Sequence, residues 1–415
     1  MTSDSDKQRG VINSWLREGL LLLVVVSVAT AIMLNVWPDS PMVDEHFHHG
    51  QILLINSADF QRVPELTTPL GYHRSVALLA RSFDVDSVTG LRALSALLGL
   101  AAVFLGWILL RQQRADFPLI VSLQILFCPL LWPFYFLLYT DTASLSLVLL
   151  ALLLFSAGMI WPTALIGVAM LAWRQNNIVW SGLFLITQLH LAFQAQRRLG
   201  ALGPLILKSL ILTLPIFAFL GFLMVNGGVA MGDHAMHQLG TALHPAQVWF
   251  FLLLFWLLLL PLHLACLGPS IQWLLAQRWR LLIVLVIPLL VFSSFDVTHP
   301  YNLALPEFHL RNGMLQALQN DWRLLLLGSI AMTWSALSLA VTRVKRPIGL
   351  WLYPVTIVAL LPVELIEQRY YIVPLVLFLL LRQPLSKSVE IALLIWFLLL
   401  SVGLTAAIAS TRYFW

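Results

Sequence analysis

Residues 17–36 read REGLLLLVVVSVATAIMLNV, a run of 20 residues with no charge after Glu18. A helix of about 20 residues crosses the hydrocarbon core of a bilayer, so this run predicts a membrane span. Lys7, Arg9 and Arg17 stand at its N-terminal end, as basic residues do in a signal peptide. The run is long, however, and no small-residue cleavage motif follows it. We therefore interpret it as a permanent span.

The whole chain shares this apolar character. Of its 415 residues, 60% are hydrophobic and 10% are charged, and the mean hydropathy is +0.88. About a quarter of the residues are charged in an average soluble protein, so this sequence has too little polar surface for a soluble globular fold. Disorder and coiled coil are excluded for the same reason. The composition predicts a membrane protein.

Apolar runs of near-spanning length recur along the chain, separated by polar, proline-containing or glycine-containing segments. Several are shorter than the roughly 20 residues of a perpendicular crossing, so tilted or merged segments would change the count by one or two. We predict an all-α, polytopic integral membrane protein in which residues 1–415 form a single transmembrane domain of about thirteen helices. The expected spans are 17–36, 91–110, 117–138, 143–158, 160–173, 177–194, 205–225, 247–268, 281–296, 323–342, 348–363, 370–382 and 388–410.

Positive charges fall on one side of this arrangement. With residues 1–16 in the cytoplasm, 15 of the 24 Lys and Arg residues lie in cytoplasmic segments: Lys7, Arg9, Arg17, Arg111, Arg114, Arg197, Arg198, Lys208, Arg278, Arg280, Arg343, Lys345, Arg346, Arg382 and Lys387. The other nine, all arginine, lie on the opposite side with 14 of the 19 acids and nine of the 11 histidines. This distribution obeys the positive-inside rule. It predicts that the reactive side chains face away from the cytoplasm.

Nucleic-acid binding and cysteine chemistry are not expected. The net charge is +5, but no basic patch alternates with aromatic residues as nucleic-acid binding requires. Cys128 and Cys266 each lie inside an apolar run, which argues against a disulfide or a thiolate metal site. We expect both to be packing residues.

The densest ionisable cluster lies in the outer loop 37–90, directly after the first span: Asp44, Glu45, His46, Phe47, His48, His49, Gly50 and Gln51. Carboxylates beside a bilayer are costly unless they are solvated or paired, so this cluster is a candidate functional site. A solvated loop mouth is the structural alternative. A carboxylate pair and three histidines could also bind zinc or manganese, but their spacing matches no established helical metal motif. We do not favour a metal.

Other polar groups interrupt the apolar runs on the same face. They are Thr67, Thr68 and Tyr72; Asp141; Arg174, Gln175, Asn176 and Asn177; Asp233, His234, His237 and His244; His299, Tyr301, Glu307, His309 and Arg311; and Glu364, Glu367, Arg369, Tyr370 and Tyr371. A helix cap is the alternative for Asp141, and snorkelling to the interface is the alternative for a single arginine. Arg174 and Arg369 have polar neighbours, which favours binding of an anionic phosphate.

Taken in order, these segments resemble the eukaryotic dolichyl-phosphate-glucose α-1,2-glucosyltransferases. The segment Met42-Val43-Asp44-Glu45-His46-Phe47-His48 is similar to the family's Met-Asp-Glu-Ile-Phe-His signature, and Gln51 follows as expected. The segment Leu66-Thr67-Thr68-Pro69-Leu70-Gly71-Tyr72 resembles Ile-Thr-Thr-Pro-Gly-Leu-Tyr, and Arg174-Gln175-Asn176-Asn177-Ile178-Val179-Trp180 resembles Arg-Gln-Thr-Asn-Ile-Val-Trp. Counterparts also exist for Asn226-Gly227 through Gly232-Asp233, for His299-Pro300-Tyr301, and for Glu367-Gln368-Arg369-Tyr370-Tyr371-Ile372-Val373-Pro374.

The sequence departs from the family in two places. Leu305-Pro306-Glu307-Phe308-His309 stands where the family has Asp-Asn-Arg-His-Tyr, so only His309 matches there. The first motif has lost its Ile and carries additional histidines. The chain is also shorter than the eukaryotic members, which points to a prokaryotic protein in a bacterial inner membrane with its active site facing the periplasm. In a eukaryote the equivalent place is the lumenal face of the endoplasmic reticulum.

The resemblance implies a GT-C fold and an inverting transfer of a hexose, glucose by the family's preference, from a polyprenyl-phosphate donor to a lipid-linked saccharide. It implies Asp44 as the catalytic base, with Glu45 as its neighbour or substitute. It implies that Arg369, Arg174, His299 and His309 bind the donor phosphate. The expected substrate-binding residues are His48, Gln51, Thr67, Thr68, Tyr72, Asp141, Gln175, Asn176, Asn177, Asp233 and Tyr370. We expect a monomer in the membrane; a divalent metal is possible but not favoured.

Two other functions remain alternatives. A transporter or flippase for a polyprenyl-linked or anionic solute would also need polar groups in a multi-span protein, but transporters usually contain internal repeats and mid-membrane charges. Neither feature is evident in this sequence. A metal-dependent membrane hydrolase would use His46, His48 and His49, and chelation would abolish its activity.

Overall fold

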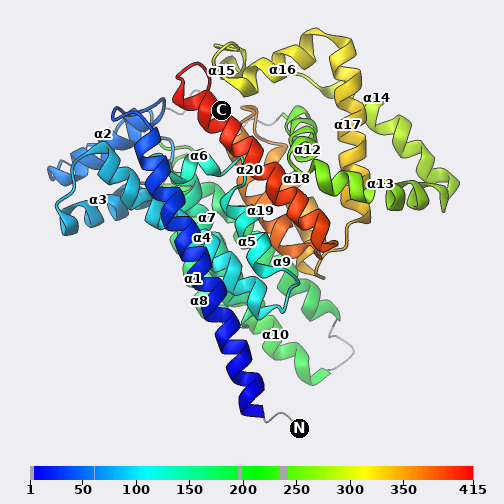
Figure 1. Cartoon of the computed structure of the whole chain (residues 1–415), viewed down its shortest axis with the longest axis horizontal. Helices are drawn as coiled ribbons and strands as arrows, with labels where there is room; N and C mark the ends of the chain where they lie inside the picture. The colour runs from blue at the N-terminus through cyan, green and yellow to red at the C-terminus, as the bar shows by residue number, and fades with distance from the viewer. Residues whose placement is uncertain (1–3, 60, 195–198, 233–241, 415) are drawn as a thin grey trace.

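A computed structural model describes residues 4–59, 61–194, 199–232 and 242–414. Within these ranges the chain forms α-helices and short 3-10 turns, and the only β-type pairings are two isolated bridges, His309 with Phe414 and Val344 with Arg382 (Figure 1). Backbone polar groups in lipid must be satisfied within each segment, which a helix does by itself. The predicted all-α class is confirmed.

The first half of the chain, up to Asn226, forms twelve helical elements among its described residues. They are α1 (Asp4–Val36), α2 (Glu45–Asn56), α3 (Gly71–Phe83), α4 (Val88–Gln112), α5 (Pro118–Leu126), α6 (Trp132–Tyr135), α7 (Thr140–Ser156), α8 (Ile160–Trp173), η1 (Gln175–Asn177), α9 (Ile178–Gln194), α10 (Leu199–Ile211) and α11 (Leu214–Asn226).

The second half begins after the loop that follows α11. Its helices are α12 (Ala246–Leu258), α13 (Leu260–Leu275), η3 (Arg278–Leu281), α14 (Leu282–Ser294), α15 (Pro300–Leu303), α16 (Leu310–Asn320), α17 (Trp322–Val341), α18 (Ile348–Leu360), η4 (Gln368–Tyr371), α19 (Ile372–Leu381) and α20 (Lys387–Ala409).

Among the described residues, five helices are long and apolar enough to cross a membrane, and the pair α12 and α13, bent by 100°, would make a sixth. The five are Asn13–Val36, Val88–Gln112, Gly203–Asn226, Trp322–Val341 and Lys387–Ala409. Shorter apolar helices lie beside them, at Thr140–Ser156, Ile160–Trp173, Ile348–Leu360 and Gln368–Leu381. The chain is therefore a polytopic integral membrane protein.

Some of the expected spans are interrupted helices. The run 117–138 divides into α5 and α6 around Pro129 and Pro133, and the run 247–268 bends where Pro261 lies in the first turn of α13. Proline removes a helical hydrogen bond and clashes with the preceding turn. A hydropathy window averages across such a break, which is why the sequence predicted more uninterrupted spans than the structure contains.

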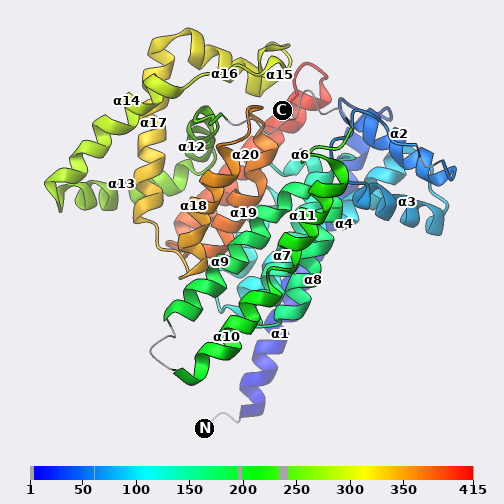
Figure 2. The ribbon, with the colours of Figure 1, turned by 180° about the vertical axis from the view of Figure 1, so that it is seen from behind.

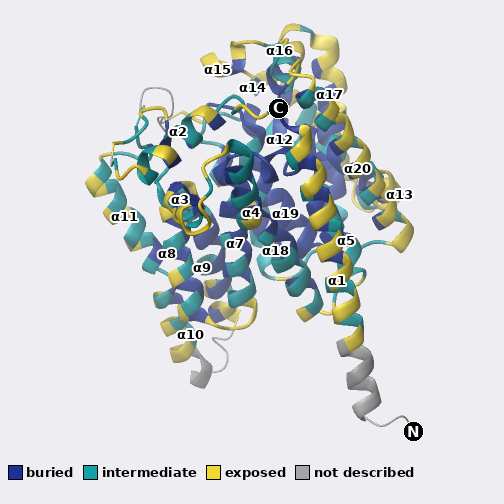
Figure 3. Ribbon diagram, turned by 60° about the vertical axis from the view of Figure 1, so that its left-hand side comes forward, coloured by how far each residue is buried: buried dark blue, intermediate teal, exposed yellow. Residues whose placement is uncertain are grey.

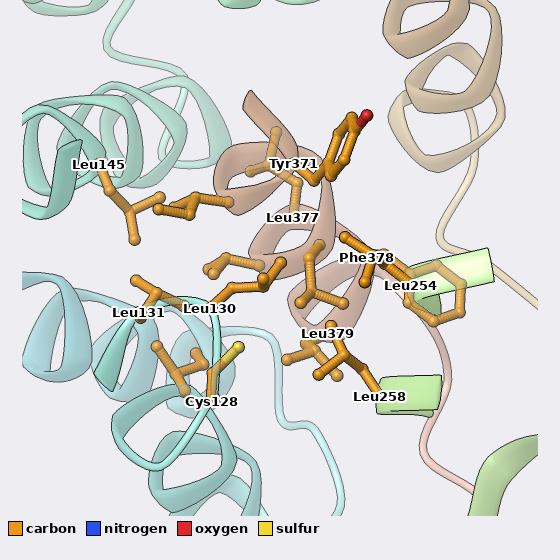
Figure 4. Packing of buried hydrophobic residues seen from close by; sticks show 14 of the residues in the cluster. Cys128, Leu130, Leu131, Leu145, Leu254, Leu258, Tyr371, Leu377, Phe378 and Leu379 are labelled. Atoms are coloured by element: carbon orange, nitrogen blue, oxygen red, sulfur yellow. The ribbon is translucent and has the colours of Figure 1, made fainter. Parts of the chain in front are cut away.

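The core lies where α19 meets α7 and α12. Every residue of α19 except Val373 is buried, and the ring of Phe378 lies 5.8 Å from that of Phe255 of α12. Figure 4 shows Phe378 and Leu379 on the side of Leu254 and Leu258. Helices α4 and α7 pack closely at Gly99, where a Cβ would lie only 2.5 Å from Thr142 Oγ1. The lack of a side chain at Gly99 allows this approach, as small residues do between membrane helices. Cys128 and Cys266 are free and buried, as predicted.

Apolar side chains also cover much of the outer surface. Figure 3 shows exposed residues along α1 and α20, and they include Leu20, Leu23, Val28, Leu399 and Val402. Exposed leucine and valine in such numbers would aggregate in water, whereas in a bilayer they contact lipid. This surface completes the case for a membrane protein.

The loops gather at two opposite ends. At one end Lys345 Nζ donates to the side chain of Gln113, and Gln383 N donates to Arg343 O over 2.8 Å, so three predicted cytoplasmic segments meet. At the other end lie α2, α3, α15 and α16, far from the N-terminal end of α1 in both views (Figures 1 and 2). The polar loops predicted to face away from the cytoplasm are therefore brought together.

Candidate active site

Two adjacent cavities occupy the end of the molecule that carries α2 and α15. Their volumes are about 490 Å³ and 430 Å³, and they share a wall made of Thr67, Thr68, Arg174, Leu365, Arg369 and Tyr370. The larger, here called the helix cavity, is also lined by residues of the apolar helices: Val179 and Trp180 of α9, Ala359 and Leu360 of α18, and Ile372 and Val373 of α19. The smaller, here called the loop cavity, is lined by loop and α2 residues: Val43, Asp44, Phe47, His48, Tyr301, Leu305, His309, Arg311 and Phe414, among others.

Arg369 stands in the shared wall and is surrounded by carboxylates from three segments. Its Nε donates to Glu367 Oε1 over 2.8 Å, and its Nη2 lies 3.1 Å from Asp44 Oδ2. Its Nη1 is 3.9 Å from Asp141 Oδ2, and its guanidinium lies over the ring of Tyr139 at 5.1 Å. Arg369 is thereby held facing both cavities. An arginine in such a place can bind a phosphate at their boundary.

Arg174 is the second cation of the shared wall. It follows α8 in an extended conformation, and its Nη1 is paired with Asp141 Oδ1 and donates to Thr140 Oγ1 over 3.1 Å. Thr140 and Asp141 form the first turn of α7. A Cβ at Gly71 would collide with Ala172 O, so this end of α8 is fixed by close packing against α3.

A buried ion pair supports Arg369 from the loop-cavity side. Glu367 accepts hydrogen bonds from Arg311 Nη1 at 2.9 Å and from Arg369 Nε at 2.8 Å. Burial of Glu367 raises its pKa, but the guanidinium groups of Arg369 and Arg311 outweigh it and hold the pKa at about 2. Glu367 is therefore charged at all working pH values. From the sequence, Arg311 was recognised only as part of a polar loop. Its contact with Glu367 could not be predicted, because the two residues are far apart in the chain.

The structure separates the two carboxylates of the first motif. Asp44 lines the loop cavity, and its side chain is 39% exposed. Glu45 is fully buried and lines neither cavity. Its Oε1 accepts from Arg92 Nε at 3.0 Å and Leu138 N at 2.7 Å, while its Oε2 accepts from Arg92 Nη2 at 2.6 Å and Met42 N at 2.8 Å. Glu45 is saturated with donors, whereas Asp44 has space beside it for a substrate.

The other residues predicted from the outer loop divide in the same way. Thr67 and Thr68 line both cavities and His48 lines the loop cavity. Tyr72 is buried away from both, with its hydroxyl 2.7 Å from Ser95 Oγ. Gln51 is also buried, and its side chain bonds the backbone of the loop at Gln61 and Val63. Tyr72 and Gln51 therefore stabilise the surrounding structure and do not line either cavity.

The Arg-Gln-Asn-Asn segment lines the helix cavity and ties it together. Gln175 Nε2 donates to Thr67 O at 2.8 Å and to Val229 O at 3.0 Å. Asn177 Nδ2 donates to Ser144 Oγ at 2.7 Å, while Asn176 also lines the cavity. The side-chain amide N–H groups of Gln175 and Asn177 are thus hydrogen-bonded within the protein. These bonds hold the segment in place as a rigid wall of the cavity.

Three buried polar atoms of residues that line the helix cavity have no hydrogen-bond partner among the described residues. They are Thr68 Oγ1, Asp141 Oδ2 and Gln175 Oε1. Folded proteins rarely leave buried polar atoms unsatisfied. Two of these atoms only accept, so they would suit the hydroxyl hydrogens of a sugar.

The predicted phosphate-binding histidines lie on different sides of the wall. His299 lines the helix cavity, and its Nδ1 accepts from Tyr301 N at 3.1 Å, whereas His309 lines the loop cavity. Tyr370 lines both cavities. Asp233 lies outside the described residues, as do His234 and His237.

Within the described ranges, no group of three or more His, Cys, Asp or Glu side chains is placed to hold a metal ion. His46, His48 and His49 share one helix but point differently: His46 is exposed, and His48 is buried against His73. The arrangement gives no support to the hydrolase alternative.

The chain is similar to proteins of known name over most of its length. The DIE2/ALG10 family matches residues 38–201 and 189–380. A Candida albicans protein named Dol-P-Glc:Glc(2)Man(9)GlcNAc(2)-PP-Dol alpha-1,2-glucosyltransferase is 26% identical, over 81% of this chain and 83% of its own. Proteins of the same name from Arabidopsis thaliana and Homo sapiens are 25% and 27% identical, covering 91% and 60% of this chain and 92% and 60% of their own.

No solved structure matches the chain. The resemblance inferred from the ordered motifs is confirmed by the family match, which covers every lining residue of the two cavities except Phe414. The chain belongs to the DIE2/ALG10 family.

Proposed function

We propose that this protein is a membrane glycosyltransferase that moves a glucosyl group from a polyprenyl-phosphate donor to a lipid-linked saccharide. The observation that carries the proposal is the pair Arg174 and Arg369 in the wall between two cavities. One cavity is lined by apolar helices, and the other contains the carboxylate of Asp44, which is 39% exposed and in contact with Arg369 on one side. The named relatives are α-1,2-glucosyltransferases that use such substrates.

The donor occupies the helix cavity. Its prenyl chain contacts the apolar residues of α9, α18 and α19, and its phosphate lies against Arg174 and Arg369. Arginine binds phosphate through two parallel hydrogen bonds, and fixed cations stabilise the charge that develops on a departing phosphate. Thr68 Oγ1, Asp141 Oδ2 and Gln175 Oε1, which have no hydrogen bond among the described residues, accept hydrogen bonds from the sugar hydroxyls.

The acceptor saccharide enters the loop cavity. Asp44 takes the proton from the attacking hydroxyl, the hydroxyl oxygen forms a bond to the sugar's anomeric carbon, and the carbon–oxygen bond to phosphate breaks with its electron pair on the phosphate. General-base catalysis of this kind contributes about 10²–10⁴-fold. Attack from the side opposite the phosphate inverts the configuration, so a β-linked donor gives an α product.

Several finer points belong to the same proposal. The fold is of the GT-C type, the protein acts as a monomer, and the two arginines make a metal unnecessary for neutralising the phosphate. The cavities face away from the cytoplasm, toward the periplasm in a bacterium or the lumen of the endoplasmic reticulum in a eukaryote. The transport alternative is not favoured, because the relatives are named as transferases and the charged groups that line the cavities lie at one end of the helices.

A transfer assay with purified protein tests the proposal. Radiolabelled polyprenyl-phosphate-glucose is incubated with extracted lipid-linked saccharides and either the wild type, Asp44→Asn, or the control Asp84→Asn. Asp84 is an exposed residue that ends α3. We expect label in a new glycolipid with the wild type and Asp84→Asn, and a loss of at least 100-fold for Asp44→Asn. Transfer by Asp44→Asn at the wild-type rate would refute the role of Asp44, and no transfer by any folded form would refute the function.

A further inference from the structure

A histidine that the sequence did not single out lies directly behind the loop cavity. His73, in the first turn of α3, is fully buried, and its Nε2 lies 2.9 Å from Nδ1 of His48. The two rings are nearly parallel, at an angle of 20°. His48 is 6% exposed and lines the loop cavity beside Asp44. One ring thus faces the cavity, and the other stands behind it as its partner.

A hydrogen bond between the two ring nitrogens needs one proton between them. This requirement determines the tautomer of each histidine. Two neutral imidazoles can bond only if one nitrogen donates and the other accepts. His73 Nδ1 is buried, and no described residue forms a hydrogen bond with it. If His48 donated, the proton of His73 would have to sit on that Nδ1 as a buried N–H without an acceptor, and orphaned N–H groups are rarer in folded proteins than under-satisfied acceptors. His73 therefore donates from Nε2, and His48 accepts at Nδ1.

With its Nδ1 accepting, a neutral His48 carries its own proton on Nε2. The side chain packs against the rings of Tyr72 and Tyr139, at centroid distances of 6.2 and 5.5 Å, which fixes its orientation. Building on the function proposed above, we propose that His73 is a positioning residue that makes His48 a hydrogen-bond donor to an oxygen of the acceptor saccharide. Held at its oxygen by His48, the attacking hydroxyl can direct its own hydrogen to Asp44.

The surroundings keep both rings neutral. Burial lowers the pKa of His48 well below its usual value, and His73, Arg369 and Arg174 lower it further. Burial, with a smaller contribution from Arg62, lowers the pKa of His73 to about 3. The other ionisable groups around the pair are Asp44 and Glu45 at the start of α2, Tyr72 of α3, and Tyr139 before α7. His48 therefore donates a hydrogen bond without adding positive charge, and the positive charge of the shared wall comes from Arg174 and Arg369.

A double-mutant cycle tests whether His73 acts through His48. The variants are His73→Leu, His48→Ala and the pair together, with His73→Gln as the matched control, because a glutamine Nε2 can donate from nearly the same place. We expect His73→Leu to lower kcat/KM for the acceptor about tenfold, with donor affinity unchanged. His73→Gln should retain most of the activity, and His73→Leu should have no further effect in the His48→Ala background. An equal loss in both backgrounds would show that His73 acts independently of His48 and overturn the proposal.

A spectroscopic measurement separates this proposal from the transferase function itself. In protein labelled with ¹⁵N-histidine, the nitrogen shifts report which ring nitrogen carries the proton, whether or not sugar is transferred. We expect a neutral His48 protonated at Nε2 in the wild type and a mixture of the two tautomers in His73→Leu. Protonation at Nδ1 in the wild type would overturn the proposal even if the enzyme were active. The expected tautomer without any transfer would refute only the function.

Discussion

Neighbouring residues can have opposite roles, as Asp44 and Glu45 do. The sequence places them side by side and cannot distinguish them. In the structure the helix α2 begins between them, so Asp44 faces the loop cavity while Glu45 turns inward to Arg92. The choice between base and structural anchor therefore depends on a contact made 47 residues away along the chain.

Glu45→Gln tests this division of roles. Arg92 is 1% exposed in its side chain, and removing its carboxylate partner leaves a buried guanidinium uncompensated. Breaking a buried ion pair costs about 3 to 5 kcal/mol, so we expect a clear fall in the thermal unfolding temperature in detergent. The same measurement on Asp44→Asn should show little change. Loss of turnover in Glu45→Gln with unchanged stability would contradict the structural role.

The histidine pair predicts how stability depends on pH. Since burial lowers the pKa of His73 from 6.5 to about 3, the unfolded chain binds more protons than the folded one between these values. Above about pH 6.5 His73 therefore does not lower the free energy of unfolding. Below that pH the free energy of unfolding falls by up to ~1.4 kcal/mol for each pH unit. Thermal unfolding of the wild type should thus respond more strongly to acidification from pH 6.5 to 4.5 than that of His73→Gln. Equal responses would show that His73 titrates normally.

At the scale of elements, a short segment after α20 forms part of the loop cavity. The segment before residue 415 returns to the outer loop, where Phe414 N donates to Phe308 O at 2.9 Å and Leu310 N donates to Phe414 O at 3.0 Å. Phe414 is buried and lines the loop cavity. This part of the cavity could not be predicted from the sequence, because the pairing joins segments about a hundred residues apart and leaves no periodic pattern.

Phe414→Ala should therefore impair acceptor binding and leave donor binding intact. The aromatic ring supplies an apolar wall against which a sugar face can pack, and we expect KM for the acceptor to rise about three- to tenfold with little change in kcat. Tyr413→Ala is the matched control, since Tyr413 is 42% exposed and does not line the cavity. A larger effect from Tyr413→Ala, or a selective rise in KM for the donor, would contradict this placement.

The helices themselves were partly predictable. Long uninterrupted runs such as α1 and α20 follow from hydropathy alone, because a buried or lipid-exposed helix leaves a continuous apolar stretch. Breaks at Pro129, Pro133 and Pro261 were hidden inside apolar runs. The polar motifs indicated which segments carry chemistry, but only the packing showed that Arg174 and Arg369 stand in one wall and that Tyr72 and Gln51 stand behind it.

For the whole molecule, the arrangement of charges predicts a fixed orientation in the membrane. Asn13–Val36 separates the N-terminal segment from α2, and the segments around Gln113, Lys345 and Gln383 meet at the end opposite the cavities. Ser82→Cys and Ser388→Cys introduce exposed thiols at the two ends, and the native cysteines are buried. A membrane-impermeant maleimide should label Ser82→Cys in intact cells or sealed lumen-out vesicles, and Ser388→Cys only after permeabilisation. The reverse pattern would invert the topology.

The most direct test of the account is a cryo-electron microscopy structure of Asp44→Asn with polyprenyl-phosphate-glucose bound. We predict that the phosphate lies between Arg174 and Arg369, that the first prenyl units contact α9, α18 and α19, and that the glucosyl group lies within reach of Asp141 and residue 44. A donor phosphate bound away from both arginines, or a prenyl chain entering through the loop cavity, would contradict the assignment of the two cavities and the reaction derived from it.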